Sequence, residues 1–245
     1  MHNAVFKNLH YDACYTRVHL LDGFKLRETF FALGLSGANV TVPHKEEAFK
    51  ACDEIRGFAK KVGVVNTIVN EDGKLIGYNT DADGFIYAIS EFENIKKVLI
   101  LGAGGTAKAL SAKFLEEAWD VSVLNRSENR LGYFKSLGCT CFTWDSFVLE
   151  EYDLVVNTTS AGLKDDHLPA PSEMIENILN HTRYAADAIY GKVTPFLQCA
   201  QNKGLTSKDG AAMLLGQGIL ANELMTRDEL SKEDIHRFMQ ESFLY

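Results

Sequence analysis

The chain of 245 residues contains no apolar run close to the ~20 residues that a membrane-spanning helix requires. Its start shows no charged segment followed by an apolar one, so we expect no secretory signal and a cytoplasmic protein. A basic stripe is also missing, and the formal net charge is −8. We therefore expect neither nucleic acid nor a membrane as a partner.

The five cysteines form no C-x-x-C pair and show no His/Cys spacing typical of a metal site. We expect reduced thiols and no metal, as is usual for a cytosolic protein. Internal repeats and low-complexity segments are absent from the sequence. Hydrophobic residues make up 46% of the chain, which is typical of a globular α/β protein.

The first third of the chain mixes strand-like and helix-like segments. The pattern predicts strands at 14–20 and 37–42 and a helix over 46–62. Two further β-rich runs flank Asp72-Gly73, and an Asp-Gly between two such runs is a strong hairpin signal.

From the run KKVLIL onward the sequence alternates regularly between strand and helix. This alternation predicts a parallel sheet with helices on both faces. We therefore predict an α/β protein of two domains. Residues 83–210 are expected to form a Rossmann-type nucleotide-binding domain, and residues 1–82 with 211–245 a smaller, mainly parallel α/β substrate domain.

A glycine-rich turn follows the strand VLIL and opens a predicted helix. Its glycines permit a tight turn and let a pyrophosphate approach the backbone, and the helix N-terminus favours negative charge. The alternative is an ordinary strand–helix turn without a ligand. The residues expected to contact a dinucleotide here are Gly102, Ala103, Gly104, Gly105, Thr106 and Ala107.

The next predicted strand ends in arginine and not in the carboxylate that usually binds the ribose 2′-OH of NAD. Arg126 and Arg130 offer forked donors that match a phosphate, so we predict NADP(H) as the cofactor. Two solvated arginines without a ligand are the alternative. Further cofactor contacts are expected from polar residues at strand ends, although these also suit simple capping: Asn125, Ser127, Thr158, Thr159 and Ser160.

Two polar segments lie at predicted strand ends in the first domain: NVTVPHK at 39–45 and GYNTD at 77–81, with Asn66-Thr67 between them. These segments resemble the shikimate dehydrogenase family. The later segments GAGG, NRS, NTTS, DAIY and TPF match the family in the same order, over nearly the whole chain. The resemblance implies an NADP-dependent oxidoreductase that reversibly reduces 3-dehydroshikimate to shikimate in aromatic amino-acid (chorismate) biosynthesis.

By this resemblance Lys45 and Asp81 are the catalytic pair. Hydride reduction of a ketone places negative charge on its oxygen, so a positioned cation or acid lowers the barrier. How far Lys45 acts as proton donor or only as binder stays open, and an ordinary surface ion pair is the alternative. We interpret His44 as structural. The resemblance also implies substrate contacts from Thr41, Asn66, Asp81, Tyr190 and Gln217, and cofactor contacts from Ile189 and Gly210.

The chain departs from the family at its start. Family members begin with a strand and an S-x-S loop that grips the substrate carboxylate, and this sequence starts at the helix that follows. We expect the natural start to lie upstream, with Met1 an internal methionine, and a mass measurement on protein from its native source tests this.

Two other functions stay open at this stage. One is a quinate/shikimate dehydrogenase of broader specificity, and the other is an N-terminally truncated protein that binds NADP(H) with little activity. Each takes a small-molecule ligand, and each is expected to be a monomer or a homodimer.

Overall fold

The computed structural model describes residues 1–243, so the last two residues of the predicted 211–245 segment lie outside it. The chain forms two compact units. The split unit comprises Met1–Gly84 and Leu215–Tyr245, and the central unit comprises Phe85–Leu214. Helices α5 (Asp81–Ala88) and α10 (Ala211–Met225) carry the chain from one unit to the other. The functional domain limits given above stay a prediction.

The central unit contains a six-stranded sheet in the order β10-β9-β8-β5-β6-β7. Every neighbouring pair in it is parallel, which confirms the predicted parallel sheet. Its strands are β5 (Lys97–Leu101), β6 (Asp120–Asn125), β7 (Thr140–Thr143), β8 (Tyr152–Asn157), β9 (Thr182–Asp187) and β10 (Thr206–Lys208).

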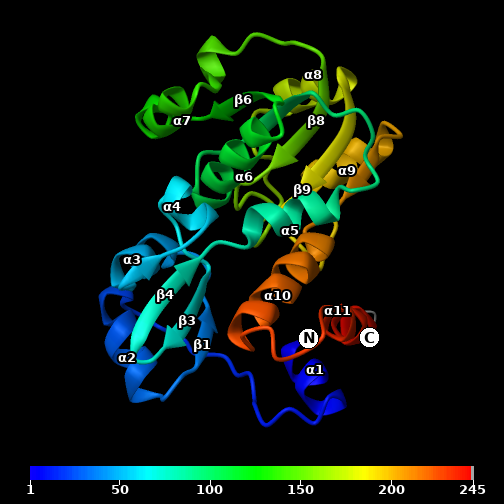
Figure 1. Cartoon of the computed structure of the whole chain (residues 1–245). Coiled ribbons are helices and arrows are strands. Elements are labelled where there is room, and N and C mark those ends of the chain that lie inside the picture. The colour runs from blue at the N-terminus through cyan, green and yellow to red at the C-terminus, as the bar shows by residue number, and fades with distance from the viewer. Residues whose placement is uncertain (244–245) are drawn as a thin grey trace. The chain divides into compact units, whose positions relative to one another are not determined.

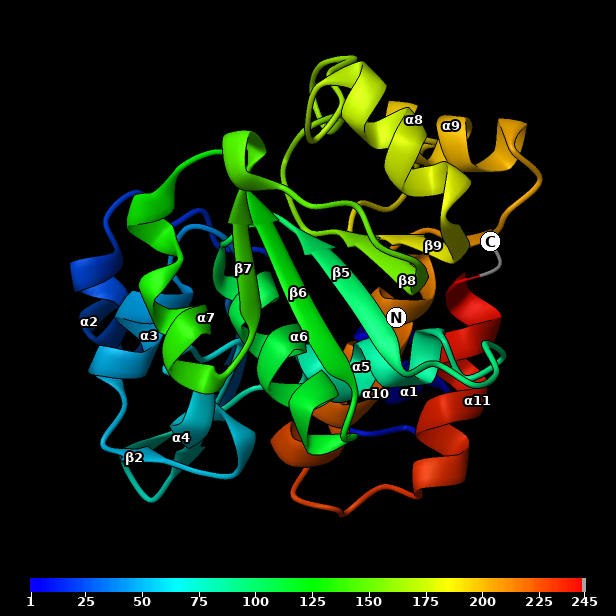
Figure 2. The same ribbon diagram turned by 90° about the horizontal axis from the view of Figure 1, so that it is seen from above.

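Helices cover both faces of this sheet, as Figure 2 shows. Apolar side chains of α6 and α7 pack with one face, and those of α8 and α9 pack with the other. Because the central strands β5 and β8 are buried on both faces, they are nearly continuous hydrophobic runs in the sequence. The helices and 3-10 turns are α6 (Gly105–Glu116), η2 (Glu128–Arg130), α7 (Gly132–Leu137), η3 (Trp144–Ser146), α8 (Ser172–Asn180) and α9 (Pro195–Asn202).

The split unit has a four-stranded sheet in the order β1-β3-β4-β2, made of β1 (Gly37–Asn39), β2 (Glu54–Ile55), β3 (Thr67–Glu71) and β4 (Lys74–Tyr78). Strands β3 and β4 form the predicted hairpin, with positive φ angles of 51° at Asp72 and 85° at Gly73. Such φ angles suit a tight hairpin turn.

The expectation of a mainly parallel sheet in this unit is wrong, although the α/β class is confirmed. The β3–β4 and β1–β3 pairs are antiparallel, and the β2–β4 pair is parallel. A two-residue hairpin can join only antiparallel strands, so the Asp72-Gly73 turn itself requires an antiparallel pair in this sheet.

Two local predictions for this unit also fail. Residues 14–20 form no strand, because their backbone is bonded to side chains and not to a neighbouring strand: Asn3 bonds Tyr15, and His44 bonds the carbonyl of Leu20. The helix expected over 46–62 is broken by β2, which pairs with β4.

The remaining helices of the split unit form two packed groups (Figure 1). Apolar residues of α1, α10 and α11 form one cluster, while α2, α3 and α4 contribute to a core with the sheet. Their bounds are α1 (His2–Asn8), η1 (Gly23–Lys25), α2 (Leu26–Ala32), α3 (Lys45–Ala51), α4 (Phe58–Val62) and α11 (Lys232–Phe243).

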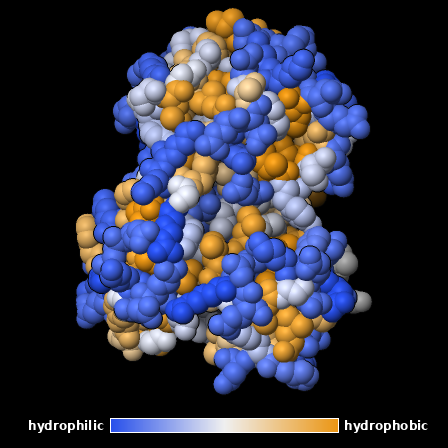
Figure 3. Space-filling view, viewed as in Figure 1, coloured by the Kyte–Doolittle hydropathy of each residue, from blue (hydrophilic) through white to orange (hydrophobic). Residues whose placement is uncertain are grey.

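Among residues 1–243, no helix combines the length and apolar character needed to cross a membrane. The space-filling view shows hydrophilic residues over much of the face seen in Figure 1, with hydrophobic residues gathered in patches between them (Figure 3).

Candidate active site

Lys45 and Asp81 are brought together in the split unit. Lys45 is the first residue of α3, and Asp81 is the first residue of α5. The Lys45 Nζ lies 2.5 Å from Asp81 Oδ2, and the two side chains are only 13% and 7% exposed. Partly buried charges are costly unless each is well partnered, so this is not an ordinary surface ion pair.

Asn66 completes the environment of the Asp81 carboxylate. Its Nδ2 donates to Asp81 Oδ1 at 2.8 Å and to Thr80 Oγ1 at 3.0 Å. The Asp81 amide in turn donates to Asn79 Oδ1 at 3.1 Å. The carboxylate therefore has a partner on each oxygen, which fixes the direction in which it presents the Lys45 ammonium.

Other predicted substrate residues differ in their placement. Gln217, on α10, accepts a hydrogen bond at its carbonyl from Thr80 Oγ1 at 3.2 Å, so it lies beside the Asp81 segment. Thr41 is exposed on the loop after β1, where its carbonyl accepts from the amide of His44. Tyr190 belongs to the central unit and is 54% exposed.

Thr80 and Asn79 are buried members of this cluster that the sequence reasoning left without a role. Thr80 is 4% exposed and contacts both Asn66 and Gln217. Asn79 also donates to the carbonyl of Val64 at 3.2 Å. Their signal in the sequence is a run of three polar residues at the end of a buried strand, since buried polar groups there need specific partners.

In the central unit the glycine-rich turn has the form that a dinucleotide requires. Gly102 has φ of +102°, and a Cβ at this position would lie 2.8 Å from Thr159 Cγ2 and 3.1 Å from Thr158 Oγ1. Helix α6 begins at Gly105 with Gly104 as its N-cap, and a Cβ on Gly104 would meet no atom within 4 Å. The open side of Gly104 leaves the backbone accessible to a phosphate.

The predicted phosphate-binding arginines, Arg126 and Arg130, follow β6 and are both exposed. Within the described part of the chain neither guanidinium has a hydrogen-bond or ion-pair partner, whereas Arg183 of the same unit bonds Asp153. Nearby, Asn125 Nδ2 donates to the carbonyl of Ser127 at 2.8 Å and shapes the turn. The residues present therefore fit a group that carries a 2′-phosphate.

The ends of β8 and β9 are locked together by buried polar side chains. Asn157 and Thr194 both donate to Asp187 Oδ2, at 3.0 and 2.6 Å. Burial raises the pKa of Asp187, and these donors oppose that shift. Asn157 Oδ1 also accepts from the amide and hydroxyl of Thr159. The bonds orient the segment that carries Thr158, Thr159 and Ser160.

Ile189 and Gly210 lie against each other in the same unit. The Gly210 amide donates to the Ile189 carbonyl at 2.9 Å. A Cβ on Gly210 would approach the Ala188 carbonyl oxygen to 2.3 Å, so only glycine fits. This close backbone contact fixes the start of α10, but a cofactor role for either residue stays a prediction.

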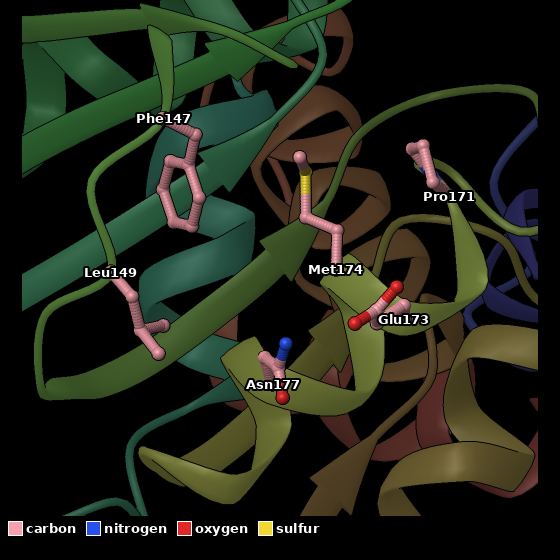
Figure 4. Close-up of a pocket in the computed structure, with 6 residues that line it drawn as sticks. All are labelled: Phe147, Leu149, Pro171, Glu173, Met174 and Asn177. Carbon is pink, nitrogen blue, oxygen red and sulfur yellow. The ribbon is translucent and has the colours of Figure 1, made fainter. Parts of the chain in front are cut away.

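The units contain two grooves, and the lining of the second includes Asn79 and Thr80 of the cluster around Asp81. One, of about 360 Å³, lies between the segment after η3 and α8, and its mostly apolar lining is shown in Figure 4. The other, of about 320 Å³, lies in the split unit, where Arg56 pairs with Glu54 and Glu71 and Lys232 pairs with Glu223. The first groove offers no acid–base pair, and these charges of the second neutralise one another. We assign neither groove a role in the chemistry.

Comparison with known proteins finds relatives of one family. Residues 1–68 match the family model described as the shikimate dehydrogenase substrate binding domain. The chain is 43% identical over 237 residues to a shikimate dehydrogenase (NADP(+)) of Helicobacter hepaticus, covering 96% of this chain and 88% of the relative.

Solved structures give the same picture. A shikimate dehydrogenase from Aquifex aeolicus matches with a TM-score of 0.83 and 32% identity, over 96% of this chain and 90% of that one. A shikimate dehydrogenase in complex with NADP+ matches with a TM-score of 0.81 and 29% identity, over 99% and 89% of the two chains. On this identity and coverage, the chain belongs to the shikimate dehydrogenase family.

Proposed function

We propose that the protein reduces the ring ketone of 3-dehydroshikimate to shikimate with NADPH, reversibly, as a step of aromatic amino-acid (chorismate) biosynthesis. The observation that carries the proposal is the partly buried Lys45–Asp81 pair, whose nitrogen and oxygen lie 2.5 Å apart although the residues are distant in the chain. Membership of the family and the glycine turn of the central unit support it.

Lys45 and Asp81 have different roles at the ketone. Negative charge develops on the carbonyl oxygen during reduction, and the Lys45 ammonium is a compact charge that can stabilise it and supply a proton. Asp81 holds the ammonium and accepts from a substrate hydroxyl. We assign Asn66, Thr41, Gln217 and Tyr190 to substrate binding, on the strength of the family motifs they occupy.

The cofactor NADPH supplies the hydride when it is bound. The turn that begins at Gly102 leads into α6, whose first backbone amides have no side-chain cap, which suits the pyrophosphate of the cofactor. We propose that Arg126 and Arg130 bind the 2′-phosphate and so favour NADPH over NADH. One chain carries every residue named here, so we propose that a single subunit is sufficient for activity, either as a monomer or within a homodimer. We also propose that the protein works in the cytoplasm, where NADPH is supplied.

A single assay tests the function. Purified protein is mixed with shikimate and NADP+, and the absorbance of the reduced nicotinamide is followed, with quinate and NAD+ in parallel. We expect a rise that requires shikimate and is much faster with NADP+. Equal rates with quinate would favour the broader dehydrogenase. NADPH binding by fluorescence without any shikimate-dependent rise would contradict the proposed activity.

A further inference from the structure

A continuous row of side-chain hydrogen bonds connects Tyr15 with the catalytic pair. The Tyr15 hydroxyl donates to Asn39 Oδ1 at 3.0 Å, and Asn39 Nδ2 donates to Thr67 Oγ1 at 3.2 Å. The Thr67 hydroxyl then donates to Asn66 Oδ1 at 3.0 Å, and Asn66 Nδ2 donates to Asp81 Oδ1 at 2.8 Å. All of these residues belong to the split unit.

Every bond in this row has its donor on the side of Tyr15 and its acceptor on the side of Asp81. The row ends on a carboxylate, the one group in it that can only accept when ionised. Hydrogen bonds in such a row polarise one another, and each link strengthens the next. The direction also fixes both amides: Asn39 must turn its oxygen to the phenol, and Asn66 must turn its nitrogen to Asp81.

Tyr15 is itself held in place by α1. Its ring stacks on His2, with the ring centroids 4.3 Å apart and the planes at 17°. Its backbone exchanges two hydrogen bonds with the Asn3 side chain, at 2.8 and 2.6 Å. Burial raises the pKa of Tyr15, so the phenol keeps its proton and remains a donor.

We propose that Tyr15 is a positioning residue of the active site, which acts through Asn39, Thr67 and Asn66 to hold the Asp81 carboxylate for Lys45. This inference rests on the proposed function for its kinetic consequences. Without the phenol, the Asn39 amide can rotate and offer its oxygen to Thr67, whose hydroxyl then turns away from Asn66. The Asn66 oxygen then keeps only the two donors on Thr80, its backbone amide and its hydroxyl, and Asp81 is held less firmly.

The first experiment compares Tyr15→Phe with Tyr11→Phe. Phenylalanine keeps the stack on His2 and removes only the donor. Tyr11 lies in the same segment and donates to Glu229 instead, which makes it a matched control. We expect Tyr15→Phe to lower kcat about fivefold, the effect of one hydrogen bond, with KM for NADPH unchanged. Tyr11→Phe should retain the kcat of the unaltered protein.

A double-variant cycle separates positioning from simple loss of stability. We expect Thr67→Val to lower kcat, and the Tyr15→Phe/Thr67→Val protein to be no slower than Thr67→Val alone, because the row is already broken. Losses that multiply, or a Tyr15→Phe protein with unaltered kcat, would overturn the proposal. Asn39→Ala breaks the next link and replaces Tyr15→Phe in the cycle if that variant does not fold.

A measurement that does not depend on turnover tests the positioning role of Tyr15 separately from the proposed function. The side-chain amide protons of Asn66 are followed by NMR in the substrate-free protein. We expect them to shift or broaden in Tyr15→Phe and to stay in place in Tyr11→Phe. Unchanged signals in both variants would overturn the positioning role, while absence of shikimate oxidation in the unaltered protein would defeat only the proposed function.

Discussion

The proposed functional residues of the two units differ in burial and in hydrogen bonding. In the split unit Lys45, Asn66 and Asp81 are largely buried and bonded to one another. In the central unit Arg126 and Arg130 are exposed and, in the described part of the chain, have no polar side-chain partner. The glycine turn there depends on backbone geometry and not on side-chain bonds.

The difference follows from what each unit has to bind. Chemistry at a ketone needs one ammonium at one place, and only a preorganised network of side chains holds it there. A dinucleotide offers negative charge at several points, so backbone amides and exposed arginines suffice. Substitutions in the split unit should therefore impair catalysis, and those in the central unit should impair stability or cofactor choice.

The largest effect is expected from Lys45→Ala. Removing the ammonium should lower kcat by about 100-fold or more, the usual range for an acid–base group. Steady-state kinetics measures the loss, and circular dichroism checks that the fold is kept. Lys50→Ala, on the same helix but 64% exposed in its side chain, is the control. A Lys45→Ala enzyme within a few-fold of the unaltered protein would remove Lys45 from the mechanism.

Glycine substitutions in the central unit should distinguish folding from binding. Gly210→Ala places a Cβ against the Ala188 carbonyl and should destabilise the protein by about 3 kcal/mol. Gly104→Ala has open space for its Cβ, so its unfolding temperature should hold while NADPH binding weakens about tenfold. Thermal unfolding and fluorescence titration measure the two effects. A Gly104→Ala protein with normal NADPH affinity would contradict the assigned pyrophosphate site.

The split unit should also lose stability in acid through His2. Burial is the main cause that lowers the pKa of His2 to about 4. The pKa of an unfolded histidine is about 6.5. A histidine whose pKa is lowered by folding contributes its full stability above that pH, and the contribution is lost as the pH falls toward 4. By pH 5 the loss should be about 2 kcal/mol.

Denaturant unfolding between pH 7 and 5 measures this loss. The control is His2→Phe, which keeps a ring against Tyr15 and cannot take up a proton. We expect the variant to show a smaller decline in unfolding free energy over this interval than the unaltered protein. Parallel curves for the two proteins would rule out His2 as the source.

A smaller effect than that of Lys45→Ala should come from Arg126→Ala. We expect the Kd for NADPH to rise about tenfold and the Kd for NADH to change little, since only NADPH carries the 2′-phosphate. Arg183→Ala, which removes an exposed arginine already paired with Asp153, should change neither value. Fluorescence titration with both nucleotides gives the ratio. Equal losses for the two would mean that Arg126 does not bind the phosphate.

Much of the central unit could be predicted because its signals are local. The strand KVLIL, the glycines after it and the helix that follows are adjacent in the sequence, and the parallel sheet follows from their alternation. The split unit was predicted less well. Residues 14–20 have a strand-like composition, but Asn3 and His44 bond their backbone, and a composition does not reveal such partners.

The sequence by itself determined the local parts: the hairpin at Asp72-Gly73, the turn after β5 and the arginines after β6. Each depends on residues that are neighbours in the chain. Tertiary structure alone decided the pairing of β1 with β3 and the meeting of Tyr15, Asn39 and Asn66 with Asp81. Those contacts join residues far apart in sequence, and only the packing of the whole unit sets distances between them.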